Sequence, residues 1–149
     1  MSLGIGSICQ RNLDLIRPDD SIATAAERMR QRSVGSLIVV NESKQPIGII
    51  TDRDLVIRAV ADGKDVEVTP VIDVMTPDLV VATGDTPIIS ALRLMRDGPF
   101  RRLPVVDDKG VLIGLVTLDD ILMIFARQIA EIGNLIELET PAASAVTEN

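Results

Sequence analysis

The sequence repeats itself at an interval of 66 residues without a gap. Residues that match at this interval include Ile22 and Ile88, Met29 and Met95, Leu37 and Leu103, Thr51 and Thr117, and Asp54 and Asp120. A register this steady indicates two copies of one supersecondary unit. A unit of about 60 residues is marginally stable alone, so we expect the two copies to pack against each other.

Both copies show the same order of elements. Apolar residues at helical spacing predict a first helix, with Ile22, Ala25 and Met29 on one face of the first copy. Two short apolar strands joined by a polar turn follow, over 36–40 and 46–51 in the first copy and over 102–106 and 111–117 in the second. Because these strands are almost continuously apolar, we expect both of their faces to be covered. The pattern predicts a fold that combines helices and strands, of the α/β (α+β) class.

A second helix closes each copy, and the two closing helices differ in length. In the first copy Leu55, Val56, Ala59 and Val60 are expected to face inward, and Gly63 is expected to end the helix. In the second copy the apolar pattern continues from Ile121 to Ile136, further than one small unit can cover. This stripe is either core or a surface that docks on a second chain. We assign residues 6–63 to the first unit, 64–70 to a linker, 71–132 to the second unit, and 133–149 to a C-terminal extension and flexible tail.

Composition excludes several function classes. Apolar residues make up 46% of the 149-residue chain, enough for a sizeable core. The net charge of −7 and an aromatic content of 1% argue against a nucleic-acid partner. The chain has no His and a single Cys9, which disfavours a disulfide framework and the commonest metal sites. No apolar run approaches transmembrane length and no signal peptide is evident, so we expect a cytoplasmic protein without a membrane partner.

The motif Gly-x-x-Thr-x-x-Asp ends the second strand of both copies, at Thr51 and Asp54 and again at Thr117 and Asp120. One interpretation is helix capping, because Thr and Asp both stabilise a helix N-terminus. The other is a ligand site, because a carboxylate can accept both hydroxyls of a ribose. Recurrence at the same repeat position fits both. Paired carboxylates in catalysis or Mg²⁺ binding are disfavoured, because no His, nucleophile or third ligand accompanies them.

In combination these segments resemble a tandem pair of cystathionine-β-synthase (CBS) domains, the Bateman module. The resemblance covers roughly residues 6–132 and rests on three features. They are the motif in both copies, the segment from Asp73 to Pro77, and the segment Arg101-Arg-Leu-Pro-Val-Val-Asp107. The first copy departs from the pattern at residues 8–10 and at Gly35-Ser36. The resemblance implies two β-α-β-β-α units in pseudo-twofold contact through their sheets, with two clefts between them.

The family resemblance also implies an adenosine-containing ligand such as AMP, ADP, ATP or S-adenosylmethionine. One cleft would combine Thr51 and Asp54 with Phe100, Arg101 and Arg102. The other would combine Thr117 and Asp120 with Val34, Gly35 and Ser36. Arg53 would add positive charge to the first cleft or form a surface ion pair. Arg101 and Arg102 either contact phosphate or form a solvated edge. On these charges the phosphorylated ligand is expected in the first cleft.

The sequence therefore predicts a non-catalytic sensor of adenine nucleotides that needs no cofactor and acts as a homodimer or on a protein target. The alternative is an interaction or scaffold module whose clefts are degenerate and empty. An enzyme is the least favoured function, because the chain offers no catalytic base or nucleophile arrangement.

Overall fold

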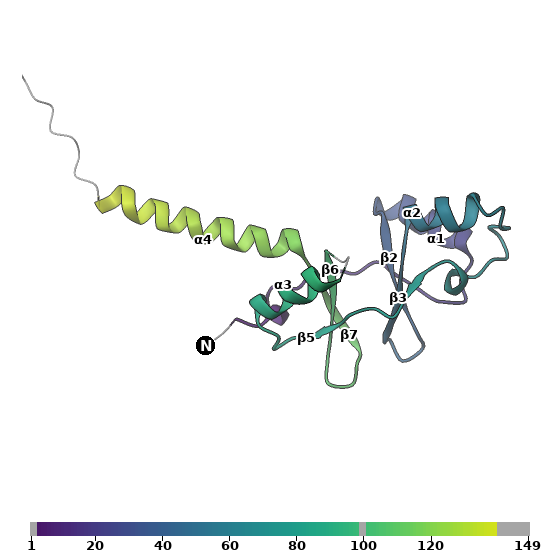
Figure 1. Cartoon of the computed structure of the whole chain (residues 1–149), viewed down its shortest axis with the longest axis horizontal. Coiled ribbons are helices and arrows are strands. Elements are labelled where there is room, and N and C mark those ends of the chain that lie inside the picture. The colour runs from purple at the N-terminus through teal and green to yellow at the C-terminus, as the bar shows by residue number, and fades with distance from the viewer. Residues whose placement is uncertain (1–2, 99–100, 140–149) are drawn as a thin grey trace, which may run out of the picture.

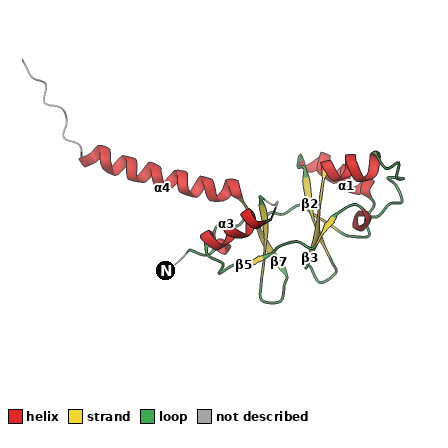
Figure 2. Ribbon diagram, viewed as in Figure 1, coloured by secondary structure: helices red, strands yellow, loops and turns green. Residues whose placement is uncertain are grey.

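The computed structural model describes residues 3–98 and 101–139, and it contains two small sheets side by side (Figure 1). The first sheet has the order β1 (Leu15–Ile16), β2 (Ser36–Val40), β3 (Pro46–Thr51) and β4 (Thr76–Pro77). The second has the order β5 (Ala82–Thr83), β6 (Arg102–Val106) and β7 (Leu112–Thr117). The α-helices are α1 (Ile22–Arg32), α2 (Asp52–Asp54), α3 (Ile88–Asp97) and α4 (Leu118–Glu139) (Figure 2). Short 3₁₀ turns are η1 (Ile5–Ser7) and η3 (Val71–Asp73), and η2 (Leu55–Val60) is a π-helix.

The strand pairing repeats as faithfully as the sequence. Strands β2 and β3 pair antiparallel with Ser36 opposite Thr51, and β6 and β7 pair antiparallel with Arg102 opposite Thr117. Each hairpin has a register shift at the same repeat position, after Val39 in one and after Val105 in the other. In each sheet a short parallel strand lies beside the first strand of the hairpin. The predicted α+β fold with two equivalent units is confirmed.

The segment that leads each copy packs on the other unit. Strand β4 pairs with β3 of the first sheet, and Val71 and Val74 belong to the first core. In return Ile5 belongs to the second core, and Gln10 bridges Leu115 of β7 through two backbone hydrogen bonds of 2.9 Å. The boundaries of the sequence repeats therefore differ from the boundaries of the packed units, because the leading segment of each copy packs on the other unit. This exchange ties the two units together.

The glycine of each motif makes the exchange possible. A Cβ at Gly48 would lie 2.5 Å from Met75 Sδ and 2.9 Å from the Thr76 carbonyl oxygen. A Cβ at Gly114 would lie 2.4 Å from Cys9 Sγ and 3.0 Å from the Gln10 carbonyl oxygen. The crossing segments therefore approach the strands at positions where only glycine fits without a shift. Cys9, half-buried against the second core, occupies the place that Met75 takes in the first unit.

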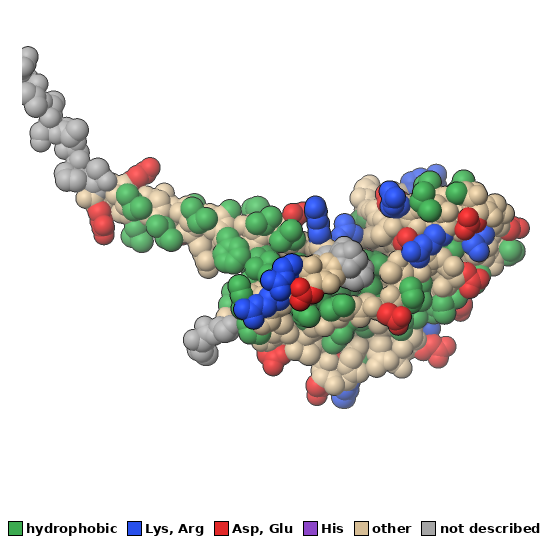
Figure 3. All heavy atoms as spheres, in the orientation of Figure 1, with side chains coloured by type: hydrophobic (Ala, Val, Ile, Leu, Met, Phe, Trp, Pro, Cys, Tyr) green, Lys and Arg blue, Asp and Glu red, His purple; other side chains and the backbone are tan. Residues whose placement is uncertain are grey.

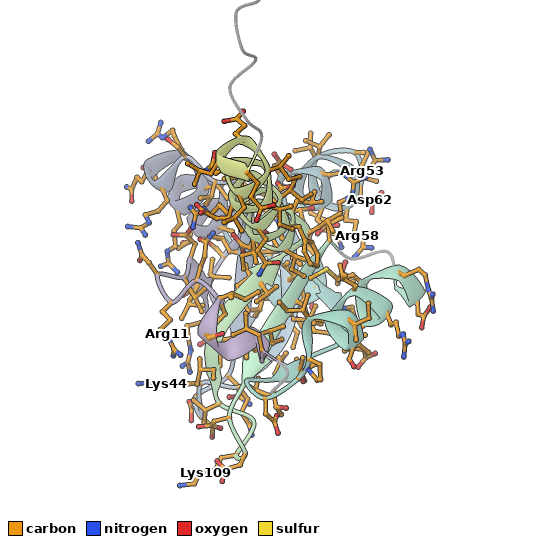
Figure 4. All side chains as sticks on the ribbon, turned by 90° about the vertical axis from the view of Figure 1, so that its left-hand side faces the viewer. Arg11, Lys44, Arg53, Arg58, Asp62 and Lys109 are labelled. Atoms are coloured by element: carbon orange, nitrogen blue, oxygen red, sulfur yellow. The ribbon has the colours of Figure 1, made fainter. Side chains whose placement is uncertain are left out.

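Strands β2 and β6 are buried on both faces, as their composition predicts, while β3 and β7 are buried on one face and half-buried on the other. Leu37 and Val39 of β2 belong to the first core, while Ile38 and Val40, which alternate with them, are buried on the opposite face. That opposite face is the one turned toward the second unit, where Ile38 and Leu115 line one cavity. At the hairpin ends the units also touch, because Leu112 N donates to the Lys44 carbonyl at 3.0 Å. Lys44 and Lys109 extend from the same end of the molecule (Figure 4).

The closing helix of the first unit differs from the prediction. Ala59 is buried and Leu55 is packed against the core, but Val56 and Val60 are exposed, so the expectation that all four face inward is wrong. The segment is α-helical only over Asp52–Asp54 and then widens into the π-helix η2, with Ala61 N donating to the Val56 carbonyl. The segment contacts α1, but Val56, Ile57 and Val60 lie on a side that is not covered.

The closing helix of the second unit, α4, projects from the body (Figure 1). It has 22 residues, which corresponds to about 33 Å of helix. Ile121 near its start is buried, and every residue from Ala126 to Glu139 is exposed. The stripe that continues to Ile136 is therefore not core of this chain. None of the helices within the described ranges combines the length and the apolar character that a membrane span requires.

Candidate functional site

Both Thr–Asp motifs form a reciprocal helix cap. Asp54 Oδ2 accepts a hydrogen bond from Thr51 N at 2.9 Å, and Thr51 Oγ1 accepts one from Asp54 N at 3.1 Å. Thr117 and Asp120 repeat this arrangement with the same two distances. The capping interpretation therefore describes the backbone geometry. It leaves Oδ1 of each carboxylate outside the cap, so capping and ligand binding are compatible.

The two remaining carboxylate oxygens have different neighbours. Asp120 Oδ1 accepts a hydrogen bond of 2.9 Å from Gln10 Nε2, which comes from the crossing N-terminal segment. Asp54 Oδ1 lies 3.8 Å from Nε of Arg58, which comes one helical turn later in the sequence. Arg58 also donates to the carbonyl oxygens of Val74 and Met75. The first carboxylate thus belongs to an ion pair within its own unit, and the second is linked to the exchanged segment.

A cavity of about 360 Å³ lies between the units. Its walls come from the segment before β2, from the hairpin strands of both units and from the N-terminal segment. The lining residues are Gln10, Asn12, Leu13, Asp14, Ser33, Val34, Gly35, Ser36, Ile38, Ile49, Arg102, Leu115 and Thr117. The cavity brings Thr117 together with Val34, Gly35 and Ser36, four of the residues that the sequence assigns to one cleft. Asp120 does not line this cavity itself, but it accepts a hydrogen bond from Gln10, which does.

Arg102 lies in this cavity and donates a hydrogen bond to Ser36 Oγ. The sequence assigned Arg102 to the cleft of Thr51, whereas the structure places it beside Thr117. The reason is symmetry, because Ser36 and Arg102 occupy equivalent positions in the two copies. Two equivalent residues that touch each other lie on the pseudo-twofold axis, at the boundary of the two clefts. A side chain at that boundary can line either of the two clefts.

A second, smaller cavity of about 260 Å³ lies at the base of α4. Arg101, Arg102, Thr117, Leu118 and Asp119 line it, so it shares two residues with the larger cavity. The Arg101 carbonyl oxygen accepts a hydrogen bond of 2.9 Å from Leu118 N, which holds the arginine pair against the helix start. This cavity therefore places two arginine residues, together with the carboxylate of Asp119, next to a helix N-terminus.

The cleft that the sequence predicts around Thr51 is arranged differently from the one beside Thr117. Thr51 and Asp54 line neither of these two cavities. Arg53 is exposed, lies on the same side of the molecule as Arg58 (Figure 4), and its backbone N–H donates to Asp52 Oδ1 at 2.8 Å. Phe100, which the sequence assigns to this cleft, lies outside the described residues. Within the described ranges, the His, Cys, Asp and Glu side chains form no group that could hold a metal ion.

Sequence reasoning missed Gln10 and the residues 12–14 that follow it in the wall of the larger cavity. The repeat places Gln10 level with Thr76, but nothing in the repeat indicates that the two segments exchange units. The contact between Gln10 and Asp120 joins residues 110 positions apart in the chain, and only the tertiary structure reveals it.

Comparison with known proteins places these features in a wider group. The sequence model of the CBS domain matches residues 5–60 and again residues 71–127. An uncharacterized protein of Methanopyrus kandleri is 39% identical over 131 residues, which span 88% of this chain and 67% of the relative. The CBS-pair protein CBSX2 from Arabidopsis thaliana superposes with a TM-score of 0.75 at 27% identity, over 88% of this chain and 99% of that one. A structure of CBSX2 in complex with AMP superposes with a TM-score of 0.69 at 27% identity, over 83% and 97% of the two chains.

Proposed function

The chain belongs to the CBS domain family and carries two CBS domains in tandem, and from this premise we propose that it senses an adenosine-containing ligand bound between its two units. A tandem CBS module is a regulatory rather than a catalytic unit. The observation that carries the proposal is the cavity of about 360 Å³, whose walls come from both units. Cavities of roughly 300–1,000 Å³ take small-molecule ligands. The AMP complex of CBSX2 supports the choice of ligand class.

The lining offers a partner for each part of an adenine nucleotide. Apolar side chains of Val34, Ile38, Ile49 and Leu115 would contact the adenine ring. Thr117 and the second oxygen of Asp120 would accept the ribose hydroxyls, once Gln10 gives up its hydrogen bond to that oxygen. Arg102, with Arg101 in the adjoining cavity, would pair with phosphate. We assign the phosphorylated ligand to this side of the module because the guanidinium groups lie here.

Binding would act by a shift in population between arrangements of the two units. A ligand held by both walls favours the arrangement in which the walls lie at the right separation. The exchanged segments couple this separation to both sheets, because each segment is paired with the opposite unit. A second copy of this chain or a protein target would then detect the change. The cytoplasm, the location expected from the sequence, fits a sensor of this kind.

One observation favours the alternative, an interaction or scaffold module without a ligand. Two of the polar groups assigned to the ligand already have partners within the protein, since Arg102 donates to Ser36 and Gln10 donates to Asp120. A cleft whose polar groups satisfy each other is stable when empty. The alternative predicts that no adenine nucleotide binds, so the two functions differ in a direct titration.

Isothermal titration of the full chain with AMP, ADP, ATP, S-adenosylmethionine and adenosine distinguishes them. We expect at least one nucleotide to bind, and we expect Arg102→Gln to weaken AMP more than adenosine. Arg93→Gln is the matched control, because Arg93 lies on α3 and lines neither cavity. Failure of all five compounds to bind at millimolar concentration would favour the scaffold module. Equal weakening of AMP and adenosine would remove Arg102 from the phosphate site.

A further inference from the structure

The projecting helix α4 carries an apolar stripe with a heptad spacing. Leu122, Phe125, Ile129, Ile132 and Ile136 follow one another at alternating intervals of three and four residues. The first four have exposed fractions of 54%, 41%, 68% and 57%. Figure 3 shows hydrophobic side chains along this helix as it leaves the body. A stripe with this period is the seam along which one helix packs on another.

The positions that flank the seam carry no charge. They are Ala126, Gln128, Gly133 and Leu135, whereas Arg127 and Glu131 lie on the opposite side of the helix. Uncharged flanks let two identical helices approach without like-charge repulsion. A helix without tertiary support is marginal in water, and Ile121 is the last buried residue of α4. The helix therefore needs a partner along most of its length.

The partner that fits is a second copy of α4. A membrane surface is disfavoured, because the helix has five acidic side chains and one basic side chain and anionic lipid would repel it. Covering the seam on two copies removes on the order of 1,000 Å² from water, the area at which a protein contact becomes specific. The contact is isologous, so it closes as a dimer instead of growing into a filament.

Glu139 sets the direction of the pair. It continues the heptad on the seam side, at the free end of the helix. In a parallel pair the two Glu139 carboxylates would face each other, which is unfavourable. In an antiparallel pair each Glu139 reaches the base of the other helix, where Arg101 and Asp119 line one cavity beside Leu118. The antiparallel pair is therefore favoured because it keeps the two Glu139 carboxylates apart and brings each of them near a guanidinium group.

We propose that two copies of this chain dimerise through antiparallel α4 helices, with Phe125 facing Ile136 of the second copy and Glu139 next to Arg101 of the second copy. In this register Ile129 faces Ile132 of the second copy at the centre. The inference deepens the sensing function proposed above by naming the surface through which a second copy is bound. It does not depend on the identity of the ligand.

Disulfide cross-linking tests the direction of the pair. In a Cys9→Ala background, Phe125→Cys and Ile136→Cys chains are mixed and oxidised. We expect a cross-link between the two variants and none within either variant alone, because equal positions lie about 16 Å apart along an antiparallel pair. Cross-linking of each variant with itself would show a parallel pair and overturn the proposal.

Light scattering of the full chain tests the surface itself. We expect the parent to be a dimer, Ile129→Asp to be a monomer, and the matched control Arg127→Asp on the opposite face to remain a dimer. Arg101→Glu should weaken the dimer, and the double variant with Glu139→Arg should restore it. A monomeric parent would overturn both the homodimer and this surface. A dimeric Ile129→Asp would overturn the surface alone, and nucleotide titration of Ile129→Asp, whose changed residue lines neither cavity, tests the sensing function separately.

Discussion

The two Thr–Asp motifs have the same backbone geometry and different surroundings. Both cap a helix with the same pair of hydrogen bonds. Asp54 then lies near Arg58 of its own helix, while Asp120 accepts from Gln10 of the exchanged N-terminal segment. The first carboxylate is part of a local ion pair, and the second is part of the contact between units. Duplication has therefore kept the cap, and the side chains around it have made the two sites chemically distinct.

The largest effect on stability is expected where the two copies remain alike, at the motif glycines. Gly48→Ala and Gly114→Ala should each lower the free energy of unfolding by about 1–3 kcal/mol, because the new Cβ meets the crossing segment at less than its contact distance. Chemical denaturation measures the loss. Gly133→Ala on α4 is the control, since no atom lies within 4 Å of that Cβ and the change favours the helix. An unchanged midpoint for either motif variant would show that the segment can move aside.

The next effect separates the two carboxylates. Asp120→Ala should weaken the nucleotide that binds best by about 1.5–3 kcal/mol, the range for a hydrogen bond to a charged group. Asp54→Ala should weaken it less, because Arg102 lies on the Thr117 side. Calorimetric titration of the two variants measures the difference. A larger loss of affinity in Asp54→Ala than in Asp120→Ala would place the phosphorylated ligand in the Thr51 cleft, as the sequence positions of the arginines indicated.

A smaller effect is expected at Gln10. Gln10→Ala should tighten nucleotide binding several-fold, because the ligand no longer competes for Asp120 Oδ1, and a neutral hydrogen bond contributes about 0.5–1.5 kcal/mol. Thr76→Ala is the matched control at the equivalent position of the other unit. Fluorescence or calorimetric titration gives the comparison. Weaker binding after the Gln10 change would mean that Gln10 holds the ligand instead of competing with it.

The smallest effect concerns the first helices of the two units. Glu27 and Arg30 form an ion pair on α1, where α3 has Arg93 and Arg96 at the equivalent positions. The hydrogen bond from Arg30 lowers the pKa of Glu27. A lowered pKa stabilises the fold above the unfolded pKa, and the contribution disappears as the pH falls through the folded pKa. Glu27→Gln should therefore lower the thermal midpoint slightly at pH 7 and by less at pH 3. A difference that persists unchanged at pH 3 would have another origin.

Much of the fold could be predicted because the repeat and the strand composition are local signals. The interval of 66 residues placed both hairpins, and their almost continuous apolar character predicted burial on both faces, as at Ile38. The closing helix of the first unit was harder, because apolar spacing does not reveal that only one side of it is covered. Val56 and Val60 are exposed for that reason.

The sequence by itself determined the family, the two equivalent units and the place of the Thr–Asp motif in each unit, since each depends on residues close together in the chain or related by one constant interval. Only the tertiary structure decided which unit each leading segment joins, where Arg102 lies and what faces Asp120. These depend on contacts between distant residues, such as Gln10 and Asp120, whose approach is set by the packing of two sheets. The local sequence pattern does not encode such contacts. A strand keeps the same alternation of side-chain directions whichever unit it pairs with.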